Sequence, residues 1–406
     1  MTYTKKRRSS NGRRNFGVKR NNRSHRRKNN KENIHPSKFI KKAIDVKLEE
    51  YVSKHTFADF NVSPTLKRNL AKKGFKSPSP IQDQSIPEGL SGKDIIGIAN
   101  TGTGKTIAFA IPVIDKLIKN KSSHVIIMAP TRELAQQILE EIKILTRGNN
   151  IYHALLIGGS SMHLQLSDLK RSPRIIIGTP GRIQDHISRK SLDLRKFDMV
   201  VLDEVDRMLD MGFVNDMKKI LSRIVGKKQS FFFSATMSDK VRTLIGEFTN
   251  NPVMISVKTS QTSDNVEQNI VKYKSGNDKI EKLHELLTLN KKNKILIFDE
   301  TKRGVDRLSK DLNKRGFRAD AIHGNKSQRQ RERALLRFKG SQTTILVATD
   351  VAARGLDVKG ITHVINYSTP QSYDDYVHRI GRAGRAGKIG YALTFIERRY
   401  SRGNKR

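Results

Sequence analysis

The chain has 406 residues and a formal net charge of +40, with 79 Lys and Arg against 39 Asp and Glu. The length predicts two compact domains, and the charge predicts a polyanionic partner. The chain has no cysteine, which excludes disulfides, thiolate metal sites and a cysteine nucleophile. It also lacks a run of about 18 apolar residues for a membrane span and the apolar core of a secretory signal, so we expect a cytoplasmic protein.

The N-terminal segment is strongly basic. Residues 1–30 contain twelve Lys or Arg and no Asp or Glu, which leaves +28 on the remaining residues. Such a composition cannot bury enough apolar area to fold. We therefore expect residues 1–48 to form a disordered basic arm that attracts phosphates without reading sequence. Binding to a protein, or a purely solubilising role, are the alternatives.

From Tyr51 onward, short apolar runs alternate with amphipathic helical patterns. This alternation is typical of α/β domains, each built on a mainly parallel sheet flanked by helices. We expect a first domain over residues 51–257, a polar linker over 258–268, a second domain over 269–396 and a basic tail over 397–406. The expected strands are Asp94–Ile98, His124–Ala129, Arg174–Gly178, Met199–Leu202, Ser230–Ser234, Ile295–Phe298, Ala319–Ile322, Thr344–Ala348 and His363–Asn366.

The run Ala99-Asn-Thr-Gly-Thr-Gly-Lys-Thr106 follows the first of these strands and precedes a helical pattern. This is the context of a phosphate-binding loop. Gly102 and Gly104 let backbone N–H groups point at an anion, and the following helix presents its positive end. Lys105 can reach the β- and γ-phosphates, and the Thr106 hydroxyl can ligate Mg²⁺. Ala99 stands where the common pattern has its first glycine.

Three carboxylates follow the strand Met199–Leu202, in the run Asp203-Glu204-Val205-Asp206. Ligands of open α/β sheets bind at the carboxyl ends of the strands. Asp203 is therefore expected to hold Mg²⁺, directly or through water, and Glu204 to polarise the attacking water.

The second half carries an arginine motif, His378-Arg-Ile-Gly-Arg-Ala-Gly-Arg385. Arg382 and Arg385 are three residues apart and share a face on a turn or helix. Paired guanidinium groups suit the charge of a phosphoryl group during transfer. A basic loop that binds only RNA is the alternative, but the phosphate loop in the other domain favours arginine fingers supplied across a cleft.

Taken together and in order, these motifs resemble those of DEAD-box ATP-dependent RNA helicases over about residues 55 to 395. The resemblance implies two tandem RecA-like domains joined by a flexible linker. Phe57 to Gln82 resembles the adenine-reading segment of the family, Ala348–Asp357 resembles its cleft motif, and Ser234-Ala-Thr236 resembles the motif that couples hydrolysis to strand separation.

The resemblance implies four sets of site residues. The catalytic set is Lys105, Asp203, Glu204, Arg382 and Arg385, and Thr106 and Asp203 are the metal ligands. Nucleotide-binding residues are Phe57, Gln82, Ala99, Asn100, Thr101, Gly102, Thr103, Gly104, Lys105, Thr106, Gly355 and Asp357. RNA-binding residues are Pro130, Thr131, Arg132, Gly159, Thr179, Gly181, Arg182, His323, Gly324, Gln328, Arg331 and Thr349. Coupling residues are Ser234, Thr236, His378 and Arg379.

The departures from the family pattern are small. Val205 replaces the usual alanine, Asn100 the usual glutamine and Ala383 the usual threonine. The resemblance implies ATP and Mg²⁺ as cofactors, a monomer, and sequence-independent binding of single-stranded RNA and short duplexes that domain closure pries apart. Ribosome or ribonucleoprotein assembly components are candidate partners. A DNA translocase of the same build and an ATP-gated RNA clamp that does not hydrolyse ATP are the alternative functions.

Overall fold

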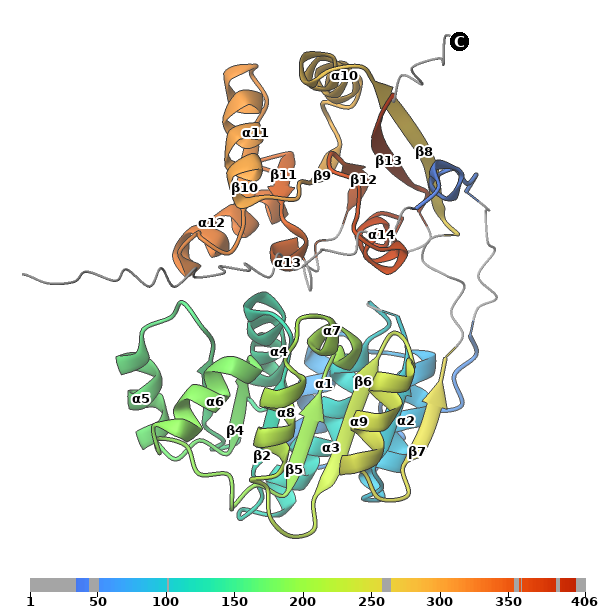
Figure 1. Cartoon of the computed structure of the whole chain (residues 1–406). Helices are drawn as coiled ribbons and strands as arrows, with labels where there is room; N and C mark the ends of the chain where they lie inside the picture. The colour runs from blue at the N-terminus through green and yellow to red at the C-terminus, as the bar shows by residue number, and fades with distance from the viewer. Residues whose placement is uncertain are drawn as a thin grey trace, which may run out of the picture.

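The computed structural model describes residues 34–43, 51–100, 102–257, 264–353, 358, 360–384 and 388–398. These residues form two α/β bodies that face each other, each with helices on both faces of a parallel sheet (Figure 1). The last strand of the first body, β7, and the first strand of the second body, β8, are both edge strands of their sheets.

The first sheet has seven strands in the order β3-β4-β2-β5-β6-β1-β7, and all of its ladders are parallel. Its central strands are buried apolar runs, because helices cover both faces. The strands are β1 (Ile95–Ile98), β2 (Val125–Met128), β3 (His153–Leu156), β4 (Ile175–Gly178), β5 (Met199–Leu202), β6 (Gln229–Ser234) and β7 (Val253–Ser256).

Helices α1 to α9 belong to this first domain. They are α1 (Pro64–Lys72), α2 (Pro80–Leu90), α3 (Lys105–Lys119), α4 (Arg132–Leu145), α5 (Met162–Lys170), α6 (Pro180–Ser188), α7 (Val205–Asp210), α8 (Val214–Leu221) and α9 (Asp239–Phe248). Two separate apolar clusters lie on the two faces of the sheet, because alternate side chains of each strand point to opposite faces.

The second sheet has six strands in the order β10-β11-β9-β12-β13-β8, again all parallel. Its strands are β8 (Val266–Tyr273), β9 (Lys294–Phe298), β10 (Ala319–Ile322), β11 (Ile345–Ala348), β12 (Ile361–Asn366) and β13 (Gly390–Glu397). Its helices are α10 (Gly276–Leu289), α11 (Lys302–Lys314), α12 (Gln328–Lys339), α13 (Asp350–Ala353) and α14 (Tyr373–Ile380). Helices α12, α13 and α14 lie on the side that faces the first body (Figure 1).

Two predicted boundaries were wrong. The predicted linker 258–268 overlaps β8, which begins at Val266 because the backbone pairs with β13 from Val266 opposite Gly390 onward. The predicted disordered arm 1–48 includes residues 34–43, which contain a short 3-10 helix, η1 (Pro36–Phe39), packed on the second domain. Phe39 provides the buried apolar contact that the composition of residues 1–30 lacks. Residues 1–33 lie outside the described residues, so the structure does not test their expected disorder.

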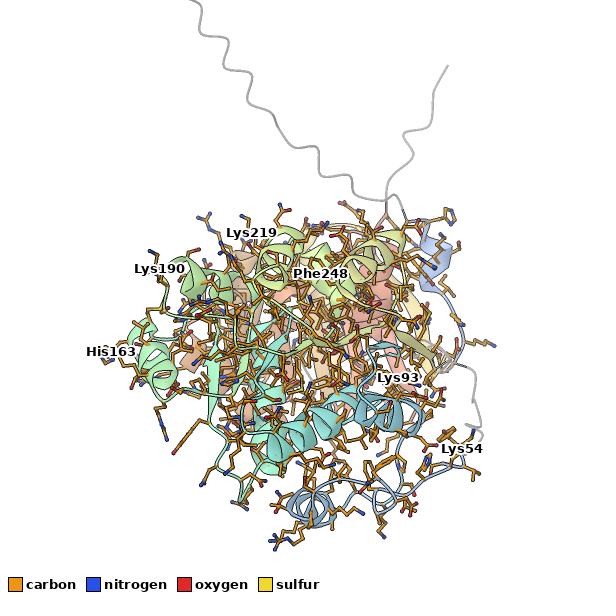
Figure 2. All side chains as sticks on the ribbon, turned by 90° about the horizontal axis from the view of Figure 1, so that it is seen from below. Lys54, Lys93, His163, Lys190, Lys219 and Phe248 are labelled. Carbon is orange, nitrogen blue, oxygen red and sulfur yellow. The ribbon has the colours of Figure 1, made fainter. Side chains whose placement is uncertain are left out.

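Many basic side chains lie on the outside of both bodies. Lys190 and Lys219 are exposed at the periphery of the first domain (Figure 2). Within the described residues, no helix is long and apolar enough to cross a membrane.

Candidate functional site

The phosphate loop lies between β1 and α3, at the carboxyl edge of the first sheet. Gly102 and Gly104 have φ angles of +89° and +90°, a backbone conformation that favours glycine. Gly104 is also the residue that precedes α3, so the loop leads directly into the positive end of that helix. Thr101 lies outside the described residues.

Lys105 is buried, with 6% of its surface exposed, and its ammonium group donates to the carbonyl oxygen of Ala99 at 2.9 Å. The Thr103 hydroxyl donates to the carbonyl oxygen of Asn100 at 2.8 Å. These two hydrogen bonds from side chains to backbone carbonyls therefore stabilise the curved conformation of the loop. The Lys105 side chain points back across the loop. A lysine in this position can transfer its hydrogen bond to a phosphate oxygen bound in the loop.

Gln82 clamps this loop from α2. Its amide nitrogen donates to the carbonyl oxygen of Gly104 at 2.9 Å, and its amide oxygen accepts from the backbone N–H of Ser79 at 2.9 Å. The Ser79 hydroxyl donates to the carbonyl oxygen of Thr103 at 2.7 Å. An added Cβ on Gly104 would collide with the Gln82 amide. The amide of Gln82 keeps one donor hydrogen and one lone pair for a base.

Phe57 lies deeper than its predicted stacking role requires. Its ring is 4% exposed and packs against Phe60 and Phe75, with centroids 5.9 and 5.3 Å away. The structure therefore places Phe57 in the apolar core behind the loop, where it supports the adenine-side segment, and leaves little of its face open.

Asp203 and Glu204 follow β5 as predicted and are 2% and 3% exposed. Burial raises the pKa of Asp203 to about 6, although the charge of Lys105 opposes this shift. The Asp203 Oδ1 atom is buried and has no hydrogen-bond partner among the described residues. A buried carboxylate oxygen without a partner is costly and suits a cation.

Glu204 has a left-handed backbone conformation, with φ 55° and ψ 55°, which is uncommon for a residue with a side chain. Its carboxylate accepts from Arg207 Nη1 at 2.7 Å, and both side chains are buried. Burial acts to raise the pKa of Glu204, but the positive charges of Arg207, Lys105 and Arg382 outweigh it, so the pKa is lowered. Arg382 comes from the second domain, so its charge acts across the cleft.

Asp206 is a residue of the acidic motif to which the sequence reasoning gave no role. Its Oδ2 atom accepts from the backbone N–H groups of Ala235 and Thr236 at 3.0 and 2.9 Å and lies 3.2 Å from the Thr236 hydroxyl. The Ser234 hydroxyl accepts from the Asp206 N–H at 3.3 Å. Hydrogen bonds therefore join the two predicted coupling residues, Ser234 and Thr236, to Asp206 of the acidic motif. The third carboxylate of Asp203-Glu204-Val205-Asp206 was the available signal.

In the second domain, α14 carries the arginine motif. Arg379 is 2% exposed and forms a two-point ion pair with Asp350, at 2.5 and 2.6 Å, and it also donates to Asn366 Oδ1 and to the carbonyl oxygen of Ser368. Arg379 therefore joins α14 to the start of α13 and to the end of β12. Arg382 is 3% exposed, just past the end of α14. Arg385, Gly355 and Asp357 lie outside the described residues.

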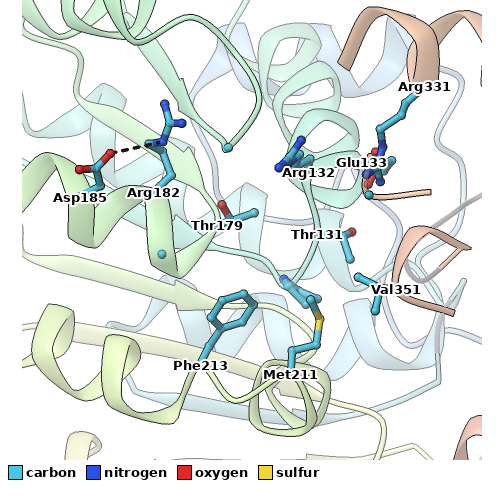
Figure 3. Close-up of a pocket in the computed structure, with 14 residues that line it drawn as sticks. Thr131, Arg132, Glu133, Thr179, Arg182, Asp185, Met211, Phe213, Arg331 and Val351 are labelled. Atoms are coloured by element: carbon cyan, nitrogen blue, oxygen red, sulfur yellow. Dashed lines mark ion pairs between the residues drawn. The ribbon is translucent and has the colours of Figure 1, made fainter. Parts of the chain in front are cut away.

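Both domains line a cleft of about 380 Å³. The predicted RNA-binding residues Arg132, Arg182 and Arg331 lie along it, and Figure 3 shows them around Thr131 and Thr179. Pro130, Gly181 and Gly324 also line it, whereas Met211, Phe213 and Val351 are lining residues that the sequence reasoning missed. The guanidinium group of Arg132 lies against Gly158 and Gly159, where a Cβ would collide with it.

Not every predicted RNA-binding residue lines this cleft. His323 is buried 3.0 Å from Asp306. Thr349 is 8% exposed and donates its N–H to the carbonyl oxygen of Ile322. Gln328 is 7% exposed and donates to Gln136 Oε1 at 2.9 Å, across the domain interface. His378 lines a small cavity beside Asp350 and Arg382.

The same interface holds a buried ion pair. Arg331 Nη2 lies 2.5 Å from Glu133 Oε1, and the two side chains are 6% and 2% exposed. The charges are close but not aligned for a hydrogen bond, and Glu133 Oε2 has no hydrogen-bond partner among the described residues. Gln136 Nε2 also donates to Glu332 Oε1 at 2.5 Å. Helices α4 and α12 therefore bring the two domains into direct contact beside the cleft.

Known proteins share these features. The DEAD/DEAH box helicase family model matches residues 79–244, and the helicase conserved C-terminal domain matches residues 278–387. ATP-dependent RNA helicase CshA of Listeria monocytogenes is 45% identical over 346 residues, which cover 84% of this chain and 66% of that protein. DEAD-box ATP-dependent RNA helicase CshA of Bacillus subtilis is 44% identical over 343 residues, 84% of this chain and 69% of that protein. The chain thus spans about two thirds of the length of these relatives.

Solved structures extend the likeness to both domains. S. cerevisiae Dbp5 bound to RNA and ADP BeF3 is 29% identical, with a TM-score of 0.74 over 85% of this chain and 90% of that one. Mss116p bound to ssRNA and AMP-PNP is 29% identical, with a TM-score of 0.77 over 88% of this chain and 78% of that one. On the two family models and these relatives, the chain belongs to the DEAD-box ATP-dependent RNA helicases.

Proposed function

We propose that this protein is an RNA-stimulated ATP hydrolase that closes its two domains around single-stranded RNA and separates short duplexes. One observation carries the proposal: residues of both domains line one cleft, with Arg132 and Arg182 from the first domain and Arg331 from the second. The charge of Arg382 in the second domain also acts to lower the pKa of the buried Glu204 in the first. A group from each domain thus acts at one phosphate-facing site, while both domains share the cleft beside it.

The residues around Asp203 fit a Mg²⁺ ion. The unpartnered Asp203 Oδ1 atom and the nearby phosphate loop with its Thr106 hydroxyl support a site in which these two residues hold the metal. No cluster of three or more His, Asp or Glu that could hold a metal occurs among the described residues, so the remaining ligands would be phosphate oxygens and water. When bound, Mg²⁺ would neutralise charge on the β- and γ-phosphates.

Each of the chain's own residues would have a separate role. The loop amides and Lys105 hold the phosphates, and Gln82 and Ser79 keep the loop in shape. Glu204, kept ionised by Arg207, orients the attacking water. Arg382 stabilises the charge that develops on the transferred phosphoryl group, and Arg385 is proposed to do the same.

Closure would link this chemistry to RNA. Asp206 joins the acidic motif to Ser234 and Thr236, and the Glu133–Arg331 pair joins the domains beside the cleft. Arginines and backbone groups along the cleft favour contacts with the sugar–phosphate backbone, which carry no sequence information. The proposed RNA selectivity would come from 2′-hydroxyls. Cytoplasmic location, a monomeric state and ribonucleoprotein partners stay predictions.

The test is phosphate release with and without single-stranded RNA. Glu204→Gln should retain ATP and RNA yet nearly stop turnover, because the water-orienting carboxylate is lost. Glu140→Gln is the matched control, since the Glu140 side chain is 68% exposed. Wild-type turnover in Glu204→Gln would reject the assignment.

Two further assays separate the alternatives. Absence of phosphate release by the wild-type protein, with ATP-dependent RNA retention intact, would indicate a clamp that does not hydrolyse ATP. Equal strand displacement on matched RNA and DNA duplexes would favour a DNA translocase.

A further inference from the structure

Residues 34–43, called the strap below, precede the first domain in sequence but lie on the second. The Lys41 N–H donates to the carbonyl oxygen of Gln268 at 3.1 Å, and the Gln268 N–H donates to the carbonyl oxygen of Lys41 at 2.8 Å. This reciprocal pair is an antiparallel bridge on β8, the edge strand of the second sheet. The strap therefore covers part of an edge that strands leave unpaired.

Phe39 anchors the strap. Its side chain is 1% exposed, and its ring packs edge-on against Tyr376 of α14, with centroids 4.7 Å apart and planes at 64°. Val266, Ile380 and Ala392 complete this apolar cluster. The next residue, Ile40, is 54% exposed. One aromatic ring thus fills a site made by β8, β13 and α14.

Charged contacts place the strap beside the incoming linker. Lys41 Nζ lies 2.6 Å from Asp264 Oδ1, two residues before β8 begins. Lys38 Nζ lies 5.4 Å from the centre of the Tyr373 ring at the start of α14. The two parts of the chain that connect the domains therefore meet at one corner of the second domain.

The segments that connect the two domains are short. Only eight Cα–Cα steps separate residue 43 on the second domain from residue 51 on the first, a reach of at most about 28 Å. The linker crosses in seven steps, from residue 257 to residue 264, a reach of at most about 25 Å. With the strap in place, two short connections join the domains.

We propose that the strap is a second tether, which limits how far the domains separate and so favours their closure on RNA. This inference rests on the proposed function, because the closure that the strap favours is the closure on RNA proposed above. The tether also anchors the basic arm to the second domain, because residue 33 is bonded directly to Ile34.

Domain separation can be measured by fluorescence energy transfer in the full-length protein. The chain has no cysteine, so Lys219→Cys and Lys310→Cys introduce two unique labelling positions. Both residues are exposed, on α8 of the first domain and α11 of the second. Distances are recorded without ligand and then with single-stranded RNA and a nonhydrolysable ATP analogue.

Three variants are compared in this background. Phe39→Ala removes the anchor, and Ile40→Ala is its neighbouring exposed control. A third variant inserts ten Gly and Ser residues between residues 46 and 47, which leaves every strap contact unchanged. Lengthening the connection from about 8 to about 18 residues should lower the effective concentration of one domain near the other by at most roughly threefold, because the linker still joins the domains.

We expect longer and broader ligand-free distances in Phe39→Ala and in the insertion variant, and wild-type distances in Ile40→Ala. The RNA concentration for half-maximal ATP hydrolysis should rise measurably, by up to roughly threefold, in both the insertion variant and Phe39→Ala. The turnover rate at saturating RNA and ATP should stay within about twofold of wild type, because the closed state is unchanged.

Unchanged distances and RNA dependence in the insertion variant would overturn the proposal, since a strap that only stabilises the second domain is insensitive to length. Loss of turnover at saturating RNA in Phe39→Ala, with unchanged distances, would overturn it too. The ligand-free distances need no catalysis, so they judge the tether even if the protein lacks RNA-stimulated ATP hydrolysis.

Discussion

The buried pair of Glu204 and Arg207 makes a measurable claim about catalysis. The two side chains are 4% and 3% exposed and are joined by a 2.7 Å hydrogen bond. Burial alone would favour the protonated form of Glu204, and Arg207 is the strongest of the charges that oppose it. Removing that charge while keeping the volume, in Arg207→Met, should therefore raise the pKa of Glu204.

The size of the effect follows from the separation. Two unit charges about 4 Å apart interact by about 4 kcal/mol at an effective dielectric constant of about 20. Removing an interaction of this size should raise the pKa of Glu204 well above its position in the wild-type protein. Lys105 and Arg382 still act on the carboxylate, so part of the lowering of the pKa of Glu204 should remain in the variant.

The assay is the pH dependence of turnover at saturating RNA and ATP. If ionised Glu204 orients the water, activity appears only above the pKa of Glu204, so the acidic limb should move to higher pH in Arg207→Met. Arg207→Lys keeps the positive charge and should move the limb much less. An acidic limb at the wild-type position in Arg207→Met, with turnover intact, would refute the electrostatic role of Arg207.

Three further predictions use the same ATPase and binding assays. Gln82→Ala should weaken the binding of both ATP and GTP, because the hydrogen bond to Gly104 is removed. If the amide also reads adenine, ATP binding should weaken more than GTP binding, which narrows the preference for ATP; an unchanged preference would limit Gln82 to its hydrogen bond with the loop. Arg382→Ala should lower kcat on the order of 10³-fold and barely change nucleotide affinity in the absence of RNA. Weaker nucleotide affinity with a normal kcat at saturating ATP would instead show that Arg382 binds the nucleotide in the ground state. Deleting residues 1–30 should weaken RNA binding and reduce the log–log slope of the RNA-binding constant against salt concentration by ~0.7 for each RNA phosphate that the arm had neutralised. ATP hydrolysis at saturating RNA should stay near wild type. An unaltered slope would remove RNA from the partners of the arm.

Buried parallel strands were the part of the fold that the sequence predicted best. The strand Met199–Leu202 was predicted with its observed bounds, because four apolar residues before an acidic turn leave little ambiguity. Strands β3, β7, β8 and β13 were not predicted. Strands β8 and β13 mix exposed and buried positions, so single-strand patterning distinguishes them poorly from loops.

The site residues, like the strands, were predicted where the signal lies in a short stretch of sequence. Local motifs predicted which residues gather at the phosphate loop, because loop, strand end and helix start are contiguous in sequence. What the sequence could not predict were partners supplied from elsewhere in the fold. The contacts of Gln82 with Gly104 and of Phe39 with Tyr376 each depend on a tertiary arrangement that no short pattern encodes. Arg207 is different, because it lies only three residues after Glu204 and is a local partner that the sequence reasoning missed.

The contacts of the acidic motif and of the domain interface explain how ATP hydrolysis and RNA binding can depend on each other. Glu204 and Asp206 lie two residues apart, and one is held by Arg207 while the other accepts hydrogen bonds from Ala235 and Thr236. A shift of Glu204 on phosphate release would therefore pull on Asp206 and on the segment after β6. Across the interface, the buried Glu133–Arg331 pair is favourable only while the two charges remain paired, because an unpaired buried charge is costly. Opening the domains instead returns both charges to water and restores their hydration, so the pair specifies how the two domains fit together when closed more than it stabilises the closed state.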